Sequence, residues 1–298
     1  MIYTVTLNPA MDHILTLPEE LAPGILNRAE TEEVKIGGKG INVSLILKEL
    51  GIESVAMGFI AGFTGTTLEH ALKEQGIQTD FIRLPGGNTR TNIKVSGLNE
   101  TEINGVGPNV TENELLKLIK KISKLQPGDI LVLAGANARG LCDDTYARIM
   151  LATPKGVKII VDGSGELLKQ AVYCEPYLIK PNEEELRELI APDGTVEWMA
   201  RKAQEMGAHS VLVSLGGNGA LLLDVDGVAH TCASPVGEVV STVGAGDALL
   251  AGFIAGLMES DDQWEALKKG VAAGSATAFS VGMANKKTID IAYNHMEE

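Results

Sequence analysis

The chain is poor in cysteine and in positive charge. Its 298 residues include only three cysteines, an odd number without metal-ligand spacing. This argues against a disulfide framework or a zinc site and fits a reducing compartment. Lys and Arg total 25 against 39 Asp and Glu, a formal charge of −14. Because nucleic acids and anionic membrane surfaces are bound by clustered basic residues, we expect neither as a partner.

Signals that direct a chain into or across a membrane are also missing. The sequence begins with a strand-like run, Ile2–Leu7, without a basic segment followed by a long apolar one. Elsewhere Lys, Glu, Asp or Gly interrupts every apolar stretch before it reaches the length of a bilayer-spanning helix. The sequence therefore predicts a soluble cytoplasmic protein.

Two familiar phosphate-binding fingerprints are absent. The stretch Gly37–Gly40 reads Gly-Gly-Lys-Gly and lacks the spacing of a P-loop. Gly244-x-Gly246 has no third glycine three residues later, as a dinucleotide fingerprint requires. If the protein uses ATP, it binds the nucleotide in another way.

What is present is the pattern of an α/β protein. From about residue 105 onward, short β-branched runs alternate with helical patterns, which is typical of a parallel sheet covered by helices. The nearly continuous apolar runs expected to be buried strands lie at 130–133, 157–161, 177–179 and 211–213. The helical patterns lie near 143–152, 165–171, 183–190 and 195–206. A capping box at Thr111 and Glu114 starts a further helix. These elements predict a single domain, residues 1–298, with a doubly wound, mostly parallel sheet flanked by helices.

Two segments, about 9–38 and 87–105, differ in composition from the rest of the chain. Pro, Gly, Asn and charged residues surround short alternating pieces such as 92–96. Between the two segments, 41–50 forms a helix that ends at Gly51 and the chain then returns to the sheet. We expect the two segments to meet as a small β-sheet that acts as a lid.

The strongest local feature is the run from Thr242 to Asp247, Thr-Val-Gly-Ala-Gly-Asp, followed by a small, apolar helix. Its two glycines allow backbone amides to converge at a helix N-terminus, which favours an anion such as a transferring phosphoryl group. A carboxylate beside such an anion hole can take the proton from an attacking hydroxyl, so Asp247 is a candidate general base. A tight turn with a dipole-favoured Asp explains the same run.

A second glycine-rich stretch opens a predicted helix. Gly37–Gly40 can bend the chain while Lys39 and Asn42 project toward a polar ligand. Asp12 can accept hydrogen bonds from sugar hydroxyls, and Arg90 can pair bidentately with a phosphate. Each of these residues is also explained by an ordinary turn or a solvated surface charge.

Polar residues follow two of the predicted strands. The run 180–185, Lys-Pro-Asn-Glu-Glu-Glu, begins where α/β proteins commonly bind ligands. Asn182 and Glu185 share a helix face and can orient a hydrated magnesium ion, or they simply begin a helix with acids in its favourable first turn. The glycine hairpin 214–220 can approach a nucleotide closely or serve only as a turn.

In their order and spacing, these motifs resemble those of the ribokinase-like PfkB carbohydrate kinases. The motifs that carry the resemblance are Asn-Pro-Ala-x-Asp at 8–12, Gly-Gly-Lys-Gly-Ile-Asn-Val at 37–43, Thr-Arg-x-Asn at 89–92, Lys-Pro-Asn-x-x-Glu at 180–185, Ser-Leu-Gly at 214–216 and Thr-Val-Gly-Ala-Gly-Asp at 242–247. The resemblance runs from residue 3 to about 285. It is strongest to the branch that contains 1-phosphofructokinase and tagatose-6-phosphate kinase.

The resemblance implies a ribokinase-like fold and an ATP- and Mg²⁺-dependent kinase for a ketohexose monophosphate. The acceptor is a primary hydroxyl of fructose 1-phosphate or tagatose 6-phosphate. The residue matching the family's base is Asp247, and those matching its anion hole are Gly244, Ala245 and Gly246. The residues matching its sugar site are Asp12, Gly38, Lys39 and Asn42, with Arg90 and Lys39 suited to the sugar's phosphate.

The resemblance also assigns the nucleotide side and the partners. Matching the phosphate and magnesium positions are Lys180, Asn182 and Glu185, and matching the nucleotide loop are Ser214, Gly216 and Gly219. Some family members bind potassium beside the anion hole, near positions matching Ser241, Val243, Thr277, Ser280 and Gly282. The family's lid closes over the sugar and often pairs with a second subunit, so a homodimer through the lid is expected.

One departure from the family concerns substrate identity. Relatives usually carry Gly-Ser-Leu-Pro-x-Gly after a core strand, where this chain reads Gly-Ala-Asn-Ala-Arg-Gly at 135–140. Asn137 or Arg139 can replace the missing serine as a phosphate ligand, or the site accepts a different sugar phosphate. The competing hypotheses are a kinase for a neutral sugar or nucleoside, which Lys39 and Arg90 argue against, and a sugar-phosphate-binding module that has lost catalysis, which the retained Asp247 argues against.

Overall fold

A large sheet forms the centre of the molecule. The structure, a computed structural model, describes residues 1–97, 99–190, 193–260 and 262–296. The strands of the central sheet are β1 (Ile2–Thr6), β4 (Ser54–Ile60), β5 (Gln78–Thr79), β6 (Ile82–Arg83), β9 (Ile130–Ala134), β10 (Lys158–Asp162), β11 (Leu178–Ile179), β12 (Ser210–Ser214), β13 (Ala220–Leu223) and β14 (Ala229–Cys232). Their order is β14-β13-β12-β11-β10-β9-β1-β4-β5, with β6 paired to β4. Pairing is parallel except at β12–β13 and β13–β14, so the mostly parallel sheet is confirmed.

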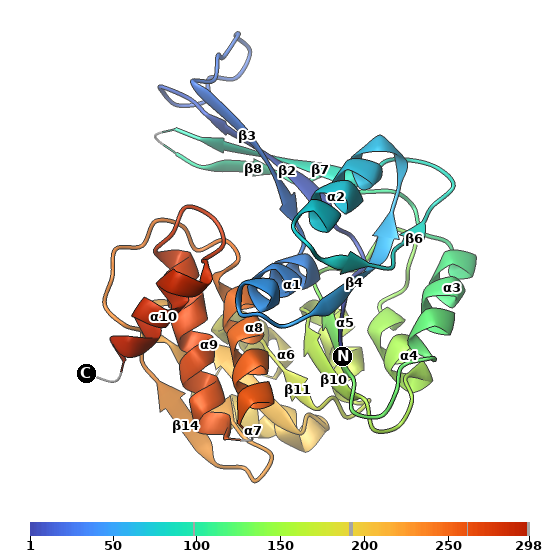
Figure 1. The fold of residues 1–298 in the computed structure, drawn as a ribbon, viewed down its shortest axis with the longest axis vertical. Coiled ribbons are helices and arrows are strands. Elements are labelled where there is room, and N and C mark those ends of the chain that lie inside the picture. The colour runs from blue at the N-terminus through green and yellow to red at the C-terminus, as the bar shows by residue number, and fades with distance from the viewer. Residues whose placement is uncertain (98, 191–192, 261, 297–298) are drawn as a thin grey trace.

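Helices cover both faces of this sheet (Figure 1). They are α1 (Lys39–Glu49), α2 (Gly62–Glu74), α3 (Glu112–Ile122), α4 (Thr145–Ala152), α5 (Gly165–Val172), α6 (Glu183–Leu189), α7 (Val196–Met206), α8 (Ala245–Glu259), α9 (Gln263–Ala278) and α10 (Lys286–Asn294). Residues of α3 to α7 share one buried apolar cluster with the strands, and residues of α1, α8, α9 and α10 share another. The two clusters confirm the doubly wound arrangement. Among the described helices, none combines the length and hydrophobicity needed to cross a membrane.

Local sequence rules explain where several helices begin. Thr111 and Glu114 form the predicted capping box of α3. The predicted strands and helices between 130 and 213 all occur, with ends displaced by a residue or two. Helix α8 lies against α9 through small residues: a Cβ at Gly252 would lie 2.6 Å from the carbonyl oxygen of Lys269, and one at Gly256 would lie 2.5 Å from the Cα of Ala266. This close approach fixes α8, whose N-terminus carries the strongest motif.

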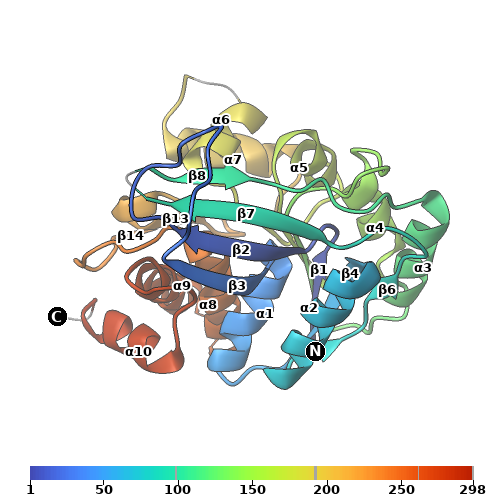
Figure 2. The ribbon, with the colours of Figure 1, turned by 90° about the horizontal axis from the view of Figure 1, so that it is seen from above.

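A second, smaller sheet stands apart from the core. Its strands are β2 (Ala10–Thr16), β3 (Thr31–Gly37), β7 (Arg90–Ser96) and β8 (Thr101–Ile103), in the order β3-β2-β7-β8. Seen from above, these strands lie across the top of the core (Figure 2). The predicted meeting of two distant segments in one sheet is thereby observed, although residue 98 of the second segment lies outside the described residues. That this sheet closes as a lid remains a prediction.

Candidate active site

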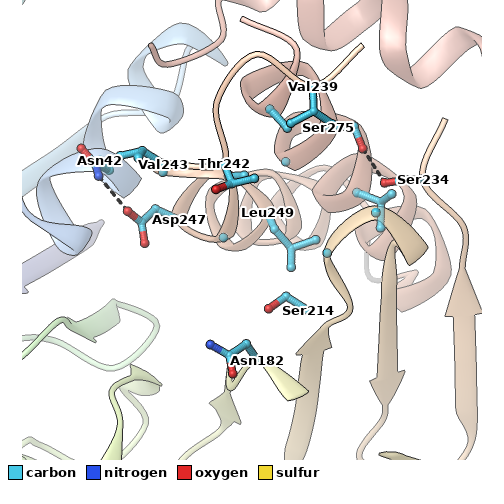
Figure 3. Close-up of a pocket in the computed structure, with 18 of the residues that line it drawn as sticks. Asn42, Asn182, Ser214, Ser234, Val239, Thr242, Val243, Asp247, Leu249 and Ser275 are labelled. Carbon is cyan, nitrogen blue, oxygen red and sulfur yellow. Dashed lines mark hydrogen bonds between the residues drawn. The ribbon is translucent and has the colours of Figure 1, made fainter. Parts of the chain in front are cut away.

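A cavity of about 890 Å³ lies between the core and the second sheet. Its walls come from the carboxyl ends of β11 and β12, from the N-termini of α1 and α8, and from β7 and β8. Polar side chains from α1, from α8 and from the ends of β11 and β12 face the same space (Figure 3). Ligands of α/β proteins bind at this edge of the sheet. Most of the predicted site residues therefore meet in one cavity.

Asp247 lies in the first turn of α8 and is 6% exposed. One of its carboxylate oxygens, Oδ2, accepts a hydrogen bond of 2.7 Å from Nδ2 of Asn42 on α1 (Figure 3). Burial, followed by the negative charge of Asp162, raises the pKa of Asp247 to about 7, against the opposing effects of Lys180, Asn42 and Lys39. A carboxylate with that pKa is matched to taking a proton near neutral pH.

The turn before Asp247 needs glycine. Gly244 has a φ of +79°, and a Cβ there would lie 2.7 Å from the sulfur of Met283. The N–H of Ala245 donates to the carbonyl of Thr242 at 3.2 Å, so this amide is engaged in the turn itself. A Cβ at Gly246 would lie 3.2 Å from Nζ of Lys180, which leaves the start of α8 open toward that ammonium group. The helix start and the lysine together favour an anion at this point.

Asp162 is a site residue that the sequence did not reveal. It ends β10, is fully buried, and lies between two lysines: Oδ1 is 2.8 Å from Nζ of Lys39, and Oδ2 is 3.1 Å from Nζ of Lys180. Burial lowers the pKa of Lys39, but Asp162, Glu185 and Asp247 outweigh that effect and raise it. The available signal was a carboxylate directly after a buried strand, as with Lys180 after β11.

Asn182 and Glu185 form a capping box at the start of α6. Oδ1 of Asn182 accepts the Glu185 N–H at 2.8 Å, and Oε2 of Glu185 accepts the Asn182 N–H at 2.9 Å. The other oxygen of Glu185, Oε1, is 3.8 Å from Nζ of Lys39. Among the described residues, no group of three or more His, Cys, Asp and Glu side chains could hold a metal ion. A hydrated Mg²⁺ held mainly by substrate phosphates fits this donor set, because it needs few protein ligands.

The opposite end of the cavity is less polar. Ser214 and Gly216 line it, as do Leu249, Val271 and Phe279. Gly219 also lines it, in the turn between β12 and β13, where a Cβ would lie 2.0 Å from the carbonyl oxygen of Cys232. The hydroxyls of Ser234 and Ser275 are 2.9 Å apart on this wall (Figure 3). The wall residues between 234 and 239 and those of α9 belong to none of the sequence motifs, and we did not predict them, whereas Thr242 and Val243 belong to the motif at 242–247.

The second sheet supplies the remaining wall with Arg90, Lys94 and Glu102. Arg90 donates from Nε to the carbonyl of Asn8 at 3.1 Å, and burial lowers its pKa while Asp12 partly offsets the effect. Asp12 lies behind this wall. Its Oδ1 accepts a hydrogen bond of 2.8 Å from Asn92, and its Oδ2 is 3.2 Å from Nζ of Lys94.

Arg139 is not brought to the site. Its side chain is exposed and is not among the described residues that line the cavity. Its carbonyl accepts the N–H of Val110 at 2.8 Å, which holds the loop after β9. Asn137 uses its own amide within that loop, donating to the carbonyl of Cys142 at 2.7 Å. Neither the Asn137 nor the Arg139 side chain is therefore placed to replace the missing serine as a phosphate ligand.

Comparison with known proteins agrees with this geometry. The model of the pfkB family carbohydrate kinases matches residues 5–289. A 1-phosphofructokinase of Bacillus subtilis is 40% identical over 97% of this chain and 96% of its own length. A D-tagatose-1-phosphate kinase of Bacillus licheniformis is 38% identical over 97% of this chain and 96% of its own. Escherichia coli phosphofructokinase-2, solved in complex with potassium, superposes with a TM-score of 0.93 at 29% identity, covering 100% of this chain and 99% of that one.

The chain belongs to the PfkB family of carbohydrate kinases. Its fold is ribokinase-like, as the motifs predicted. It is a phosphotransferase with an alcohol group as acceptor and, more closely, a sugar-phosphate kinase. The family implies ATP and Mg²⁺ as its donor and cofactor.

Proposed function

We propose that the protein transfers the γ-phosphoryl group of ATP to the C6 hydroxyl of a ketohexose 1-phosphate, with fructose 1-phosphate as the principal acceptor. The observation that carries this proposal is the 40% identity, over nearly the whole chain, to a 1-phosphofructokinase. The relative named for D-tagatose 1-phosphate supports a second acceptor with the same arrangement of phosphate and hydroxyl. Tagatose 6-phosphate, with its free hydroxyl at C1, is the alternative to be tested beside them.

Asp247 acts as the general base in this reaction. Its carboxylate takes the proton of the sugar hydroxyl as that oxygen bonds to the γ-phosphorus, and the bond from phosphorus to the bridging oxygen of ADP breaks. Asn42 holds the carboxylate through its hydrogen bond of 2.7 Å. The start of α8, with Gly244 and Gly246, and the ammonium groups of Lys39 and Lys180 stabilise the negative charge on the transferring group.

Three further assignments belong to the same proposal. Asn182 and Glu185 hold Mg²⁺ through its waters, and when bound the ion neutralises charge on the nucleotide phosphates. Ser214, Gly216 and Gly219 face the nucleotide. Potassium fits between the segments 240–243 and 277–282, which are joined by hydrogen bonds of 2.8 and 3.1 Å from the N–H groups of Val240 and Ser241 to the carbonyl of Ala278. A relative solved in complex with potassium supports binding of this ion.

The second sheet closes over the sugar and pairs with the same sheet of another subunit. Its position across one wall of the cavity supports closure, which excludes water that competes with the sugar hydroxyl. Asp12, Gly38 and Asn42 then hold the sugar. We place the protein in the cytoplasm, where sugar phosphates and ATP are available.

A substrate panel tests the proposal. ADP release is followed with fructose 1-phosphate, tagatose 1-phosphate, fructose 6-phosphate, tagatose 6-phosphate, free ketohexoses and a nucleoside. We expect the 1-phosphates to have the highest kcat/KM and Asp247→Asn to lose on the order of 10²–10⁴-fold in kcat. Asp224→Asn, at a buried acid paired with His230 away from the cavity, is the matched control. Preference for a 6-phosphate, or undiminished turnover by Asp247→Asn, would contradict the proposal.

A further inference from the structure

The basic side chains that face the cavity fall into two groups. Lys39 and Lys180 belong to the core, and both contact the buried carboxylate of Asp162, at 2.8 and 3.1 Å. Arg90 and Lys94 belong to β7 of the second sheet. A ketohexose monophosphate kinase needs cations at two places, because its acceptor carries one phosphate and receives another at the opposite end of a six-carbon chain.

The core lysines serve the transferring phosphoryl group. Lys180 lies next to Gly246 at the start of α8, and the charge of Lys39 acts on Asp247. Both ammonium groups also hold the same carboxylate, Asp162, so they lie together near the start of α8, where the proposed phosphate ester forms. The phosphate already on the sugar lies far from the base and needs ligands elsewhere.

The loop after β9 does not provide them. Ala136 has no polar side chain, the Asn137 amide donates to the carbonyl of Cys142, and Arg139 is exposed outside the described cavity wall. Among the described residues that line the cavity, those of the second sheet are the remaining source of cations. Arg90 is half-buried, and no carboxylate of the described residues lies within ion-pair distance of it, so its guanidinium is free to pair with an anion.

Lys94 lies on the same face of β7 as Arg90, because side chains alternate along a strand. Its Nζ is 3.2 Å from Oδ2 of Asp12 and 3.7 Å from Oε1 of Glu102, and its side chain is 20% exposed and lines the cavity. An ammonium group has three N–H donors, so contact with two carboxylates leaves one for a ligand. The two acids hold the ammonium at the wall.

Lys94 determines the net charge of this wall. Arg90 and Lys94 together cancel Asp12 and Glu102, so the wall is neutral overall and a phosphate can approach the two cations. Without Lys94 the same wall carries one net negative charge and repels a phosphate dianion. A free sugar carries no charge and is nearly indifferent to that change.

We propose that Lys94 selects phosphorylated over free ketohexoses by binding, together with Arg90, the phosphate that the substrate already carries. This inference rests on the proposed function, and it adds a specificity residue that none of the sequence motifs contains. It also assigns Lys39 to the transferring phosphoryl group and not to the sugar's own phosphate.

The test compares three variants with the parent. Lys94→Met removes the charge, Lys94→Arg keeps it, and Lys35→Met removes a lysine of the same sheet that pairs with Glu33 and is not among the described residues lining this cavity. For Lys94→Met we expect kcat/KM for fructose 1-phosphate to fall about 10- to 100-fold, mainly through KM, as for loss of a charge-assisted contact. The loss for free fructose, measured by turnover or as a competitive inhibitor, is much smaller. Lys94→Arg recovers most of the loss, and Lys35→Met resembles the parent.

Two results would overturn the inference. Equal losses for fructose 1-phosphate and fructose would mean that Lys94 only holds Asp12, and unchanged kinetics would mean that it does not touch the substrate. Calorimetric titration with fructose 1-phosphate in the absence of ATP gives the same comparison without turnover, and Lys94→Arg covers the case in which the Met variant does not fold. Failure of the proposed function is distinct from both, because the parent itself would then turn over no ketohexose monophosphate.

Discussion

At the scale of single residues, the most informative side chain is a carboxylate that meets no substrate in the proposed reaction. Asp162 is fully buried and holds Lys39 and Lys180, and it is also the neighbouring charge that most raises the pKa of Asp247. Two lysines beside a base would otherwise favour its charged form and weaken it as a proton acceptor. Asp162 thus holds both lysines in place and keeps the pKa of Asp247, the proposed base, near neutrality.

Asp162→Asn is expected to shift the pH dependence of the reaction. The negative charge of Asp162 raises the pKa of Asp247, so removing it, and releasing Lys39 and Lys180 from their partner, lowers that pKa. The acidic limb of the kcat/KM profile then moves to lower pH, by on the order of one unit, while kcat falls. Profiles of the parent and of Asp224→Asn serve as references. A lower rate with an unmoved acidic limb would show that Asp162 does not control the base.

At the scale of elements, the tight contact between α8 and α9 determines where the start of α8, the proposed anion hole, lies. Gly256→Ala introduces a Cβ 2.5 Å from the Cα of Ala266, a backbone atom that cannot move aside without displacing α9. We expect the free energy of unfolding to fall by about 1–3 kcal/mol, as for other overpacked contacts, with the start of α8 displaced. Urea denaturation measures the change. Gly86→Ala is the control, since nothing lies within 4 Å of a Cβ there, and an equal loss in both variants would contradict the packing argument.

Elements with their own local signals were the ones that the sequence predicted well. The capping box of Thr111 and Glu114 marks α3, and apolar runs bounded by glycine and proline mark the parallel strands. Motif residues such as Asp247 and Asn42 meet as the resemblance implied, although they are 205 residues apart in the chain. Helix α2 was not predicted, because its small and polar residues form no clear apolar stripe.

The site residues that the sequence did not predict correctly share a physical reason. Asp162 becomes a site residue only because Lys39 and Lys180 approach it from distant parts of the chain, and no spacing rule reveals such a meeting. Arg139 has the right chemistry for a phosphate, yet its side chain lies outside the described cavity wall. Side-chain direction in a loop depends on backbone geometry that neighbouring sequence leaves open.

At the scale of the whole molecule, the cavity takes its cations from two places, Lys39 and Lys180 from the core and Arg90 and Lys94 from the second sheet. The chain as a whole carries a formal charge of −14, so anionic substrates depend on these few basic side chains. In the proposed function, the core lysines serve the transferring phosphoryl group, and Arg90 and Lys94 of the second sheet bind the phosphate of the sugar. When ATP and the sugar phosphate are both bound, we therefore expect the core and the second sheet to contact the ligands at the same time.

Binding of the two substrates is expected to be cooperative. With fructose 1-phosphate and a non-hydrolysable ATP analogue together, amide hydrogen exchange in β7 should slow more than with either ligand alone, and the rise in Tm should exceed the sum of the separate rises. Exchange in β12, which belongs to the core, is the internal reference. Strictly additive effects on both measurements would show that the second sheet does not close over the occupied site.

A single residue joins β3 to α1, and this joint bears on the proposed closure of the second sheet. Strand β3 ends at Gly37 and α1 begins at Lys39, so only Gly38, with a φ of +132°, separates the sheet from the helix. Gly37 also lies close against Asp12, since a Cβ there would be 2.9 Å from that carboxylate. In the proposed closure, rotation of the sheet acts through Gly38 on the helix start that carries Lys39 and Asn42. In the proposed reaction, a sugar that pulls the sheet inward therefore acts on the helix start whose Asn42 already holds Asp247, and we expect an enzyme with ATP alone to hydrolyse little of it.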